Sequence, residues 1–127
     1  MPLSWIVDDD DEMSHAVQLM LKLLEFKVER YRDARSAARA LLSGQRPDVL
    51  ILDINMPEVS GIDMLEFVRM RPELKTLPIV MLSSETTDVQ VDEAMAKGAD
   101  AFIFKPVTVE ELEGALARVM RAQSPPG

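Results

Sequence analysis

Five short apolar runs alternate along this chain with five longer segments in which apolar residues recur every three or four positions. Short apolar runs bounded by Pro, Gly or charged residues are typical of strands, and the wider spacing is typical of helices. Because a helix separates each strand from the next, we expect the strands to run parallel through right-handed crossovers. The predicted strands are Ser4–Asp8, Lys27–Tyr31, Val49–Asp53, Ile79–Leu82 and Ala101–Phe104.

The helical segments each show an apolar stripe along one face. Gly44 is suited to cap the second helix, and the fourth helix is expected to stop at Gly98. The third and fourth helices are predicted at Asp63–Arg71 and at about Thr87–Lys97. The stripes of the first, second and fifth helices are Met13, Ala16, Val17, Met20, Leu23 and Leu24; Ala34, Ala37, Ala38, Leu41 and Leu42; and Val109, Leu112, Ala115, Leu116 and Val119.

This alternation predicts a doubly wound α/β fold with strand order 2-1-3-4-5. In such a flavodoxin-like three-layer sandwich, a five-stranded parallel sheet lies between two layers built from five helices. The length of 127 residues fits one domain. We expect the domain to span residues 1–122, and residues 123–127 to be a disordered tail or the start of a linker.

Composition and charge argue against several classes of protein. The chain has no Cys, which excludes a disulfide framework and any thiolate metal site. The net charge is −8 and the 14 Lys and Arg are scattered, so direct binding of nucleic acid is not expected. No apolar run approaches the length of a membrane span and no secretory signal is visible, and we expect a cytoplasmic protein that does not bind membranes.

Polar side chains follow the predicted strands at the edge where open parallel sheets bind ligands. Strand 1 ends in Asp8 and Asp9, strand 3 in Asp53, strand 4 in Ser83 and strand 5 in Lys105. Adjacent strands lie about 4.8 Å apart, so these side chains should converge on one pocket. Clustered carboxylates repel one another unless a cation lies among them, and Mg²⁺ suits such ligands. Asp53 could then attack a phosphoryl donor, with Lys105 and Ser83 contacting phosphoryl oxygens.

Four motifs at these strand ends resemble the signatures of response-regulator receiver domains. Each motif is weak by itself, but the four occur in order and each at the end of the expected strand. The segment Gly98–Phe102 also fits the family, and the resemblance runs from about Leu3 to Arg121. The motifs are Val7-Asp8-Asp9, Asp53-Ile54-Asn55-Met56-Pro57, Met81-Leu82-Ser83-Ser84 and Lys105-Pro106.

The resemblance implies a chemical role for each residue of the pocket. Asp53 resembles the family's phosphoacceptor, and Lys105 resembles its phosphate-contacting lysine. Asp9 resembles the family's direct Mg²⁺ ligand, and Asp53 would also belong to the metal site. Asp8 would hold a metal-bound water, and Asn55 would offer its backbone carbonyl to the ion.

Other positions are implied to control the switch and its lifetime. Ser83 is similar to the family's switch hydroxyl, and Phe102 occupies the switch aromatic position, which is often Tyr; simple core packing is the alternative role for Phe102. Asn55 and Glu85 stand where the family tunes hydrolysis of the phosphoryl group. The peptide bond before Pro106 is expected to be cis.

The function implied by the resemblance is a signalling switch rather than a conventional enzyme. A sensor histidine kinase or a histidine-phosphotransfer protein would phosphorylate Asp53. The surface formed by helix 4, strand 5 and helix 5 would then change, and a downstream effector protein would bind the changed surface. Val91, Met95 and Val107 are candidate contacts on that surface, and the sequence does not distinguish exposed from buried residues there. Homodimerisation on phosphorylation is compatible with this scheme but is not indicated by the residues.

Three other interpretations compete with a phosphorylated receiver. Haloacid-dehalogenase-like phosphatases also use an Asp nucleophile with Mg²⁺, but they carry a second Asp two residues later, where this chain has Asn55. A flavodoxin-like electron carrier is disfavoured, because the acids after strand 1 would repel the phosphate of FMN. A degenerate receiver that only contacts other proteins usually lacks the acid pair, the acceptor or the lysine. The single histidine, His15, is predicted to be a surface residue.

Overall fold

The computed structural model describes residues 1–84 and 87–122, except for the side chains of residues 121 and 122. The strands are β1 (Leu3–Val7), β2 (Lys27–Tyr31), β3 (Val49–Asp53), β4 (Ile79–Ser83) and β5 (Ala101–Phe104). The helices are α1 (Asp11–Leu23), α2 (Ala34–Leu42), α3 (Gly61–Arg69), α4 (Asp88–Ala96) and α5 (Val109–Ala122), with a 3₁₀ turn η1 at Pro72–Leu74. None of the helices in these ranges is long and apolar enough to cross a bilayer. The predicted tail at residues 123–127 lies outside the described part.

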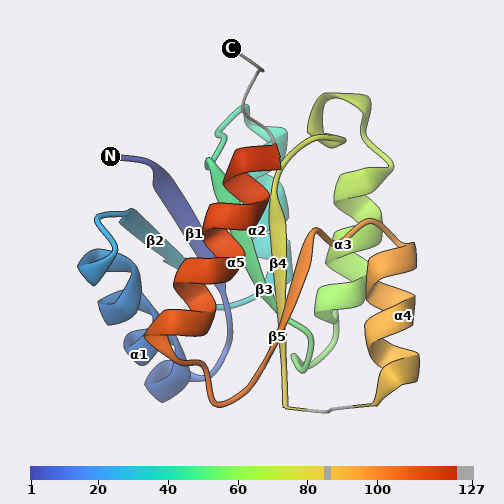
Figure 1. Cartoon of the computed structure of the whole chain (residues 1–127). Helices are drawn as coiled ribbons and strands as arrows, with labels where there is room; N and C mark the ends of the chain where they lie inside the picture. Colours follow the sequence, from blue (N-terminus) through green and yellow to red (C-terminus); the bar gives the residue numbers. More distant parts are fainter. Residues whose placement is uncertain (85–86, 123–127) are drawn as a thin grey trace.

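The sheet is parallel, with strand order β2-β1-β3-β4-β5 (Figure 1). Strands β3 and β4 are buried at every position, and β1 is buried at every position after Leu3. A strand covered on both faces needs apolar residues at successive positions, which explains the continuous apolar runs. The predicted fold class and strand order are confirmed.

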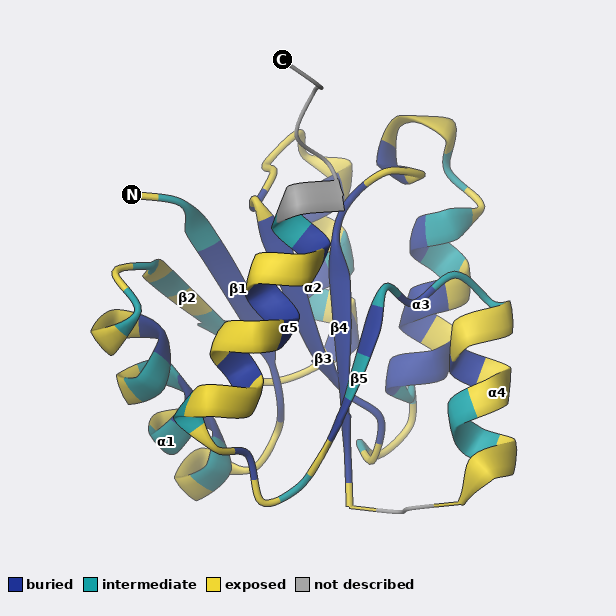
Figure 2. Ribbon diagram, in the orientation of Figure 1, coloured by how far each residue is buried: buried dark blue, intermediate teal, exposed yellow. Residues whose placement is uncertain are grey.

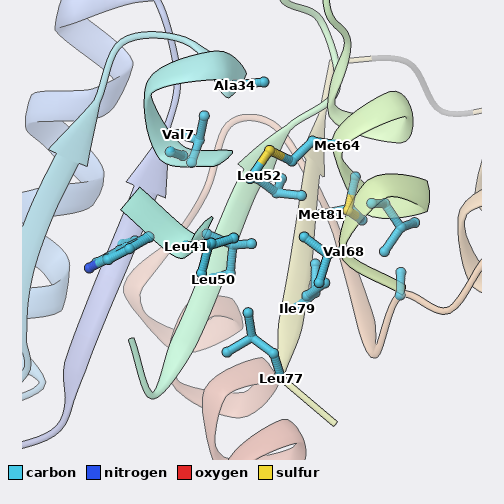
Figure 3. Close-up of a cluster of buried hydrophobic side chains, with 14 of the residues drawn as sticks. Val7, Ala34, Leu41, Leu50, Leu52, Met64, Val68, Leu77, Ile79 and Met81 are labelled. Atoms are coloured by element: carbon cyan, nitrogen blue, oxygen red, sulfur yellow. The ribbon is translucent and has the colours of Figure 1, made fainter. Parts of the chain in front are cut away.

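Alternate residues of the inner strands supply two separate cores, one on each face of the sheet. Figure 2 shows that the inner strands are buried and that the outer sides of the helices are exposed. Leu50 and Leu52 point to the face covered by α2, α3 and α4, where they join a cluster that includes Met64 (Figure 3). Val49 and Ile51 point to the opposite face, which α1 and α5 cover. The helices therefore bury one stripe each and leave their outer faces to solvent.

Helix α3 differs from the predicted span Asp63–Arg71, because it begins and ends two residues earlier. Ser60 Oγ accepts a hydrogen bond from Asp63 N–H, and the Asp63 carboxylate accepts one from Ser60 N–H. This capping box makes Asp63 the third helical residue rather than the first. The helix ends early because Arg71, which precedes Pro72, has an extended backbone.

Two apolar residues of the predicted stripes are exposed, and two apolar residues outside those stripes are buried. Leu23 and Leu42 are exposed, at 74% and 55%, because each is the last residue of its helix and lies off the buried face. Leu21, which the predicted stripe leaves out, is fully buried one turn after Val17. Val107, a candidate partner contact whose exposure the sequence left open, is buried in the core beneath α1 and α5 and does not lie on that surface.

Candidate functional site

The polar residues predicted at the strand ends gather at one edge of the sheet. Asp8 directly follows β1, Asp53 and Ser83 are the last residues of β3 and β4, and Lys105 directly follows β5. Strand β1 lies between β2 and β3, so the strand order reverses beside Asp8. Ligands of doubly wound sheets bind at this position, because the loops there diverge and leave a crevice.

Three carboxylates form the acidic part of the site. One oxygen from each of Asp8, Asp9 and Asp53 lies within 4.8 Å of the others. Asp8 and Asp53 are only 0% and 1% exposed, whereas Asp9 is exposed. Lys105 Nζ lies 3.0 Å from Asp53 Oδ1, so one ammonium group faces three acids. The surplus of negative charge suits a divalent cation.

The two oxygens of Asp8 have different surroundings. Asp8 Oδ1 accepts a hydrogen bond of 2.9 Å from Asp10 N–H. Asp8 Oδ2 is buried and has no hydrogen-bond partner among the described residues. Burial raises the pKa of Asp8 to about 6, and the negative charge of Asp53 adds to the rise. A buried carboxylate oxygen without a donor fits a hard cation, which prefers oxygen ligands.

Asp53 is held from two sides. Its Oδ1 accepts a hydrogen bond of 3.2 Å from Asn55 N–H and also faces the Lys105 ammonium. Gly61, the first residue of α3, lies directly against this strand end, since a Cβ there would be 2.3 Å from the Asp53 carbonyl oxygen. Only glycine permits that approach. The sequence marked Gly61 as a loop residue, and its role in packing α3 against the acceptor strand was missed.

Ser83 is buried and points toward α4. Its hydroxyl donates to Gln90 Oε1 at 2.8 Å and lies 3.4 Å from Asn55 Oδ1. Gln90 stands in the first turn of α4, which Thr87 caps. The side chain predicted to meet a phosphoryl group is therefore linked directly to the helix that borders the predicted output surface. Gln90 was missed because a polar residue on a helix normally faces solvent.

The remaining predicted positions that the structure describes lie on β5, in the loop after it, on α4 and after β3. Phe102 is half-buried against the core, and its ring packs at a tilt on the exposed Phe104, with 5.2 Å between centroids. The peptide bond between Lys105 and Pro106 is cis. On α4, Val91 is half-buried and Met95 is exposed. Asn55 is exposed, and Glu85 lies outside the described residues.

Arg30 in β2 contacts the backbone that carries the acid pair. Its guanidinium donates two hydrogen bonds to the Asp8 carbonyl oxygen and one to the Asp11 carboxylate. Nothing in the sequence singles out this residue, because an Arg on an edge strand normally faces solvent. His15 lies on the exposed side of α1, away from the core, as predicted.

Comparison with known proteins identifies the family. A family model described as the response regulator receiver domain matches residues 5–117. The chain belongs to this family. The chemotaxis protein CheY of Pseudomonas aeruginosa is 32% identical over 114 residues, which cover 90% of this chain and 92% of that protein. CheY-3 of Vibrio cholerae is 34% identical, over 90% of this chain and 88% of its own length.

Solved structures agree with this membership. CheY4 of Vibrio cholerae matches the receiver domain with a TM-score of 0.84 and 36% identity, over 94% of this chain and 98% of that one. A putative response regulator from Chloroflexus aurantiacus matches with a TM-score of 0.89 and 28% identity over the same shares.

Other relatives are much longer than this chain. The match spans 17% of the protein RcaC of Microchaete diplosiphon at 33% identity, and 55% of the phosphate regulon regulator PhoB of Rhizobium meliloti at 31%. Receiver domains thus occur both as nearly whole proteins and as parts of larger ones. The family defines a signalling module of two-component systems, with an acidic pocket in which receiver domains bind Mg²⁺.

Proposed function

We propose that this receiver domain accepts a phosphoryl group on Asp53 in an Mg²⁺-dependent reaction. The donor would be a phosphohistidine on a sensor histidine kinase or on a histidine-phosphotransfer protein. The observation that carries the proposal is the convergence of a buried Asp53, its Lys105 partner and two further acids at the switch in strand order. The cytoplasmic location remains a prediction.

The transfer step forms one bond and breaks one. An oxygen of the Asp53 carboxylate attacks the phosphorus, and the phosphorus–nitrogen bond to the donor imidazole breaks with its electron pair going to nitrogen. Lys105 Nζ, 3.0 Å from Asp53 Oδ1, is placed to donate to a phosphoryl oxygen as charge shifts onto it. The product is an acyl phosphate on Asp53.

The acids around Asp53 would hold the ion. Asp8, Asp9 and Asp53 supply carboxylate oxygens, and Asn55 would add its backbone carbonyl. When bound, Mg²⁺ supplies positive charge that offsets the repulsion between these acids and the phosphoryl oxygens. The unpartnered Asp8 Oδ2 supports this assignment.

The switch would begin at Ser83. A phosphoryl group on Asp53 competes with Gln90 and Asn55 for the Ser83 hydroxyl, because its oxygens are charged acceptors. Release of Gln90 would alter α4, and the half-buried Phe102 ring could move into the space left by Ser83. The surface of α4, β5 and α5 would then present a changed face to an effector or to a second copy. Asn55 and Glu85 would set the rate of hydrolysis.

The alternatives receive less support. Residue 55, two positions after the acceptor, is Asn rather than the Asp that a haloacid-dehalogenase-like phosphatase uses as acid and base. A receiver that serves only as a contact module would not need a buried aspartate paired with a half-buried lysine beside two more acids. These features favour phosphorylation.

Intact-mass measurement tests the proposal directly. The native chain and Asp53→Asn are incubated with acetyl phosphate, with and without Mg²⁺. A single phosphoryl adduct on the native chain that requires Mg²⁺ and is absent from Asp53→Asn supports the proposal. No adduct on the native chain, under conditions where a rapid quench excludes loss by hydrolysis, would contradict it.

A further inference from the structure

Arg30 makes a two-pronged contact with the main chain of the acid pair. From β2, its Nε and Nη2 both donate to the Asp8 carbonyl oxygen, at 3.1 and 2.9 Å. Its Nη1 donates to Asp11 Oδ1 at 3.0 Å. The side chain is only 18% exposed, and the Arg30 backbone stands opposite Ile6 in the register between β2 and β1. The guanidinium is therefore held over the end of β1.

The bonded carbonyl belongs to the peptide group that joins Asp8 to Asp9. A peptide group is planar, so fixing the direction of its oxygen also fixes the direction in which the chain leaves toward Asp9. Asp8 N–H donates to the Tyr31 carbonyl, and Asp8 Oδ1 is anchored by Asp10 N–H. Arg30 supplies the remaining restraint, at the one peptide group that sets the two acids relative to each other.

Arg32 provides a natural comparison. Its Nη1 pairs with the same Asp11 Oδ1, but within the described residues it makes no hydrogen bond to Asp8 or Asp9. Its side chain is 64% exposed, against 18% for Arg30. Each of the two arginines brings one positive charge to the rim of the site. Only Arg30 also bonds to the backbone of the acid pair.

We propose that Arg30 is a positioning residue that preorganises Asp8 and Asp9 for Mg²⁺. This inference rests on the proposed function, since it assumes that these acids bind the ion. The two roles open to an arginine here predict opposite effects. A purely electrostatic arginine repels the ion, so its removal strengthens Mg²⁺ binding. A positioning arginine lowers the cost of ordering the ligands, so its removal weakens Mg²⁺ binding.

The test is an Mg²⁺ titration of the full chain followed through backbone amide shifts by NMR, for the native protein, Arg30→Met, Arg30→Lys and Arg32→Met. We expect Arg30→Met to weaken binding about 10-fold, the scale found when a partner that orients a metal ligand is removed. Arg30→Lys keeps the charge and loses the planar fork, so it should also bind more weakly than the native chain. Arg32→Met should bind as tightly as the native chain or slightly tighter.

A second readout needs no metal. Exchange of the Asp10 amide, which is bonded to Asp8 Oδ1, should become faster in Arg30→Met without Mg²⁺ and stay unchanged in Arg32→Met. Native affinity and native exchange in both Arg30 variants would overturn the role of Arg30, and so would tighter Mg²⁺ binding by Arg30→Met. Failure of the native chain to bind Mg²⁺ would instead contradict the proposed function. If Arg30→Met does not fold, Arg30→Lys decides the matter alone, because its charge is unchanged.

Discussion

At the scale of single residues, Asp8 shows how a site can be built at a cost to the fold. Its carboxyl group is fully buried beside Asp53, and burial raises its pKa from the ordinary 3.8 to about 6. The folded chain therefore holds the Asp8 proton more tightly than the unfolded chain does. Without a metal, the contribution of Asp8 to stability is present below about pH 4 and is lost as the pH rises through about 6.

Replacing this carboxylate by an amide should stabilise the metal-free protein. We expect Asp8→Asn to raise the free energy of unfolding at about pH 7.5 by about 1–3 kcal/mol, and to have much less effect near pH 3, where Asp8 is largely protonated in both states. Urea unfolding in EDTA at the two pH values measures this. Asp92→Asn, which removes an exposed carboxylate from α4, serves as the control. An equal rise in unfolding free energy for Asp8→Asn and Asp92→Asn would show that burial of the Asp8 carboxylate is not the cause of the rise.

Gln90 should restrain the switch. It accepts the Ser83 hydrogen bond in the unphosphorylated structure, so its loss removes stability from that state only. We expect Gln90→Ala to raise the extent of phosphorylation at limiting acetyl phosphate by about 2- to 10-fold, which corresponds to one hydrogen bond. Quantitative intact mass measures it. Gln18→Ala, which removes a similar bond to Ser14 on α1, should leave the extent unchanged. A lower extent of phosphorylation in Gln90→Ala than in the native chain would argue against a restraint of the switch by Gln90.

At the scale of elements, Arg69 joins four segments at the end of the sheet opposite the acids. From the last turn of α3, it donates to Gly98 O at 2.9 Å, to Leu74 O at 3.1 Å and to the Asp100 carboxylate at 2.9 Å. Asp100 in turn accepts from Ile79 N–H at the start of β4. Gly98 has a φ of +108°, and a Cβ there would meet the Arg69 side chain at 2.9 Å. The arginine is thus clamped between η1 and the turn before β5.

Removing this arginine should destabilise the fold without changing the acceptor chemistry. We expect Arg69→Met to lower the free energy of unfolding by about 3 kcal/mol, because Asp100 and two carbonyls lose their donor. The free energy of unfolding of Arg69→Lys should lie between those of the native chain and Arg69→Met. Arg71→Met, which breaks an exposed pair with Glu73, should cost less than about 1 kcal/mol. Urea unfolding compares the three variants, and phosphorylation below each unfolding midpoint should match the native chain. An equal loss of unfolding free energy in Arg69→Met and Arg71→Met would contradict this role of Arg69.

At the scale of the whole molecule, the sheet concentrates negative charge at one edge. The net charge is −8, and three acids meet where the strand order reverses. Monovalent salt weakens the general repulsion, whereas a bound divalent ion acts only on the folded state. The stability of the protein should therefore respond to Mg²⁺ beyond the effect of ionic strength.

Thermal unfolding at matched ionic strength in MgCl₂ and in NaCl separates the two effects. We expect Mg²⁺ to add about 1.4 kcal/mol of stability when its concentration is about ten times Kd. Asp9→Asn, which removes an exposed carboxylate of the site, should lose most of this increment and keep the response to NaCl. An equal gain from both salts in the native chain would indicate screening alone.

Much of the site followed from local sequence. Asp53 and Ser83 end apolar runs and Lys105 follows one, so the position of each along the fold could be assigned before any contact was known. Parallel strands place such residues at a common edge, and this geometric rule predicted that they converge. The continuous apolar runs predicted central strands covered on both faces, and the strand order was expected from the doubly wound fold class.

Other features depend on register and packing, which no local pattern contains. Arg30 reaches the Asp8 carbonyl only because β2 pairs with β1 as it does, and Gln90 reaches Ser83 only because α4 begins where Thr87 caps it. Exposure at Leu23 and burial of Leu21 were decided by the way α1 packs on the sheet. The sequence determined the elements and the chemistry at their ends, since these rest on short-range preferences. Tertiary structure decided which side chains hold that chemistry in place, because residues distant in sequence meet only after folding.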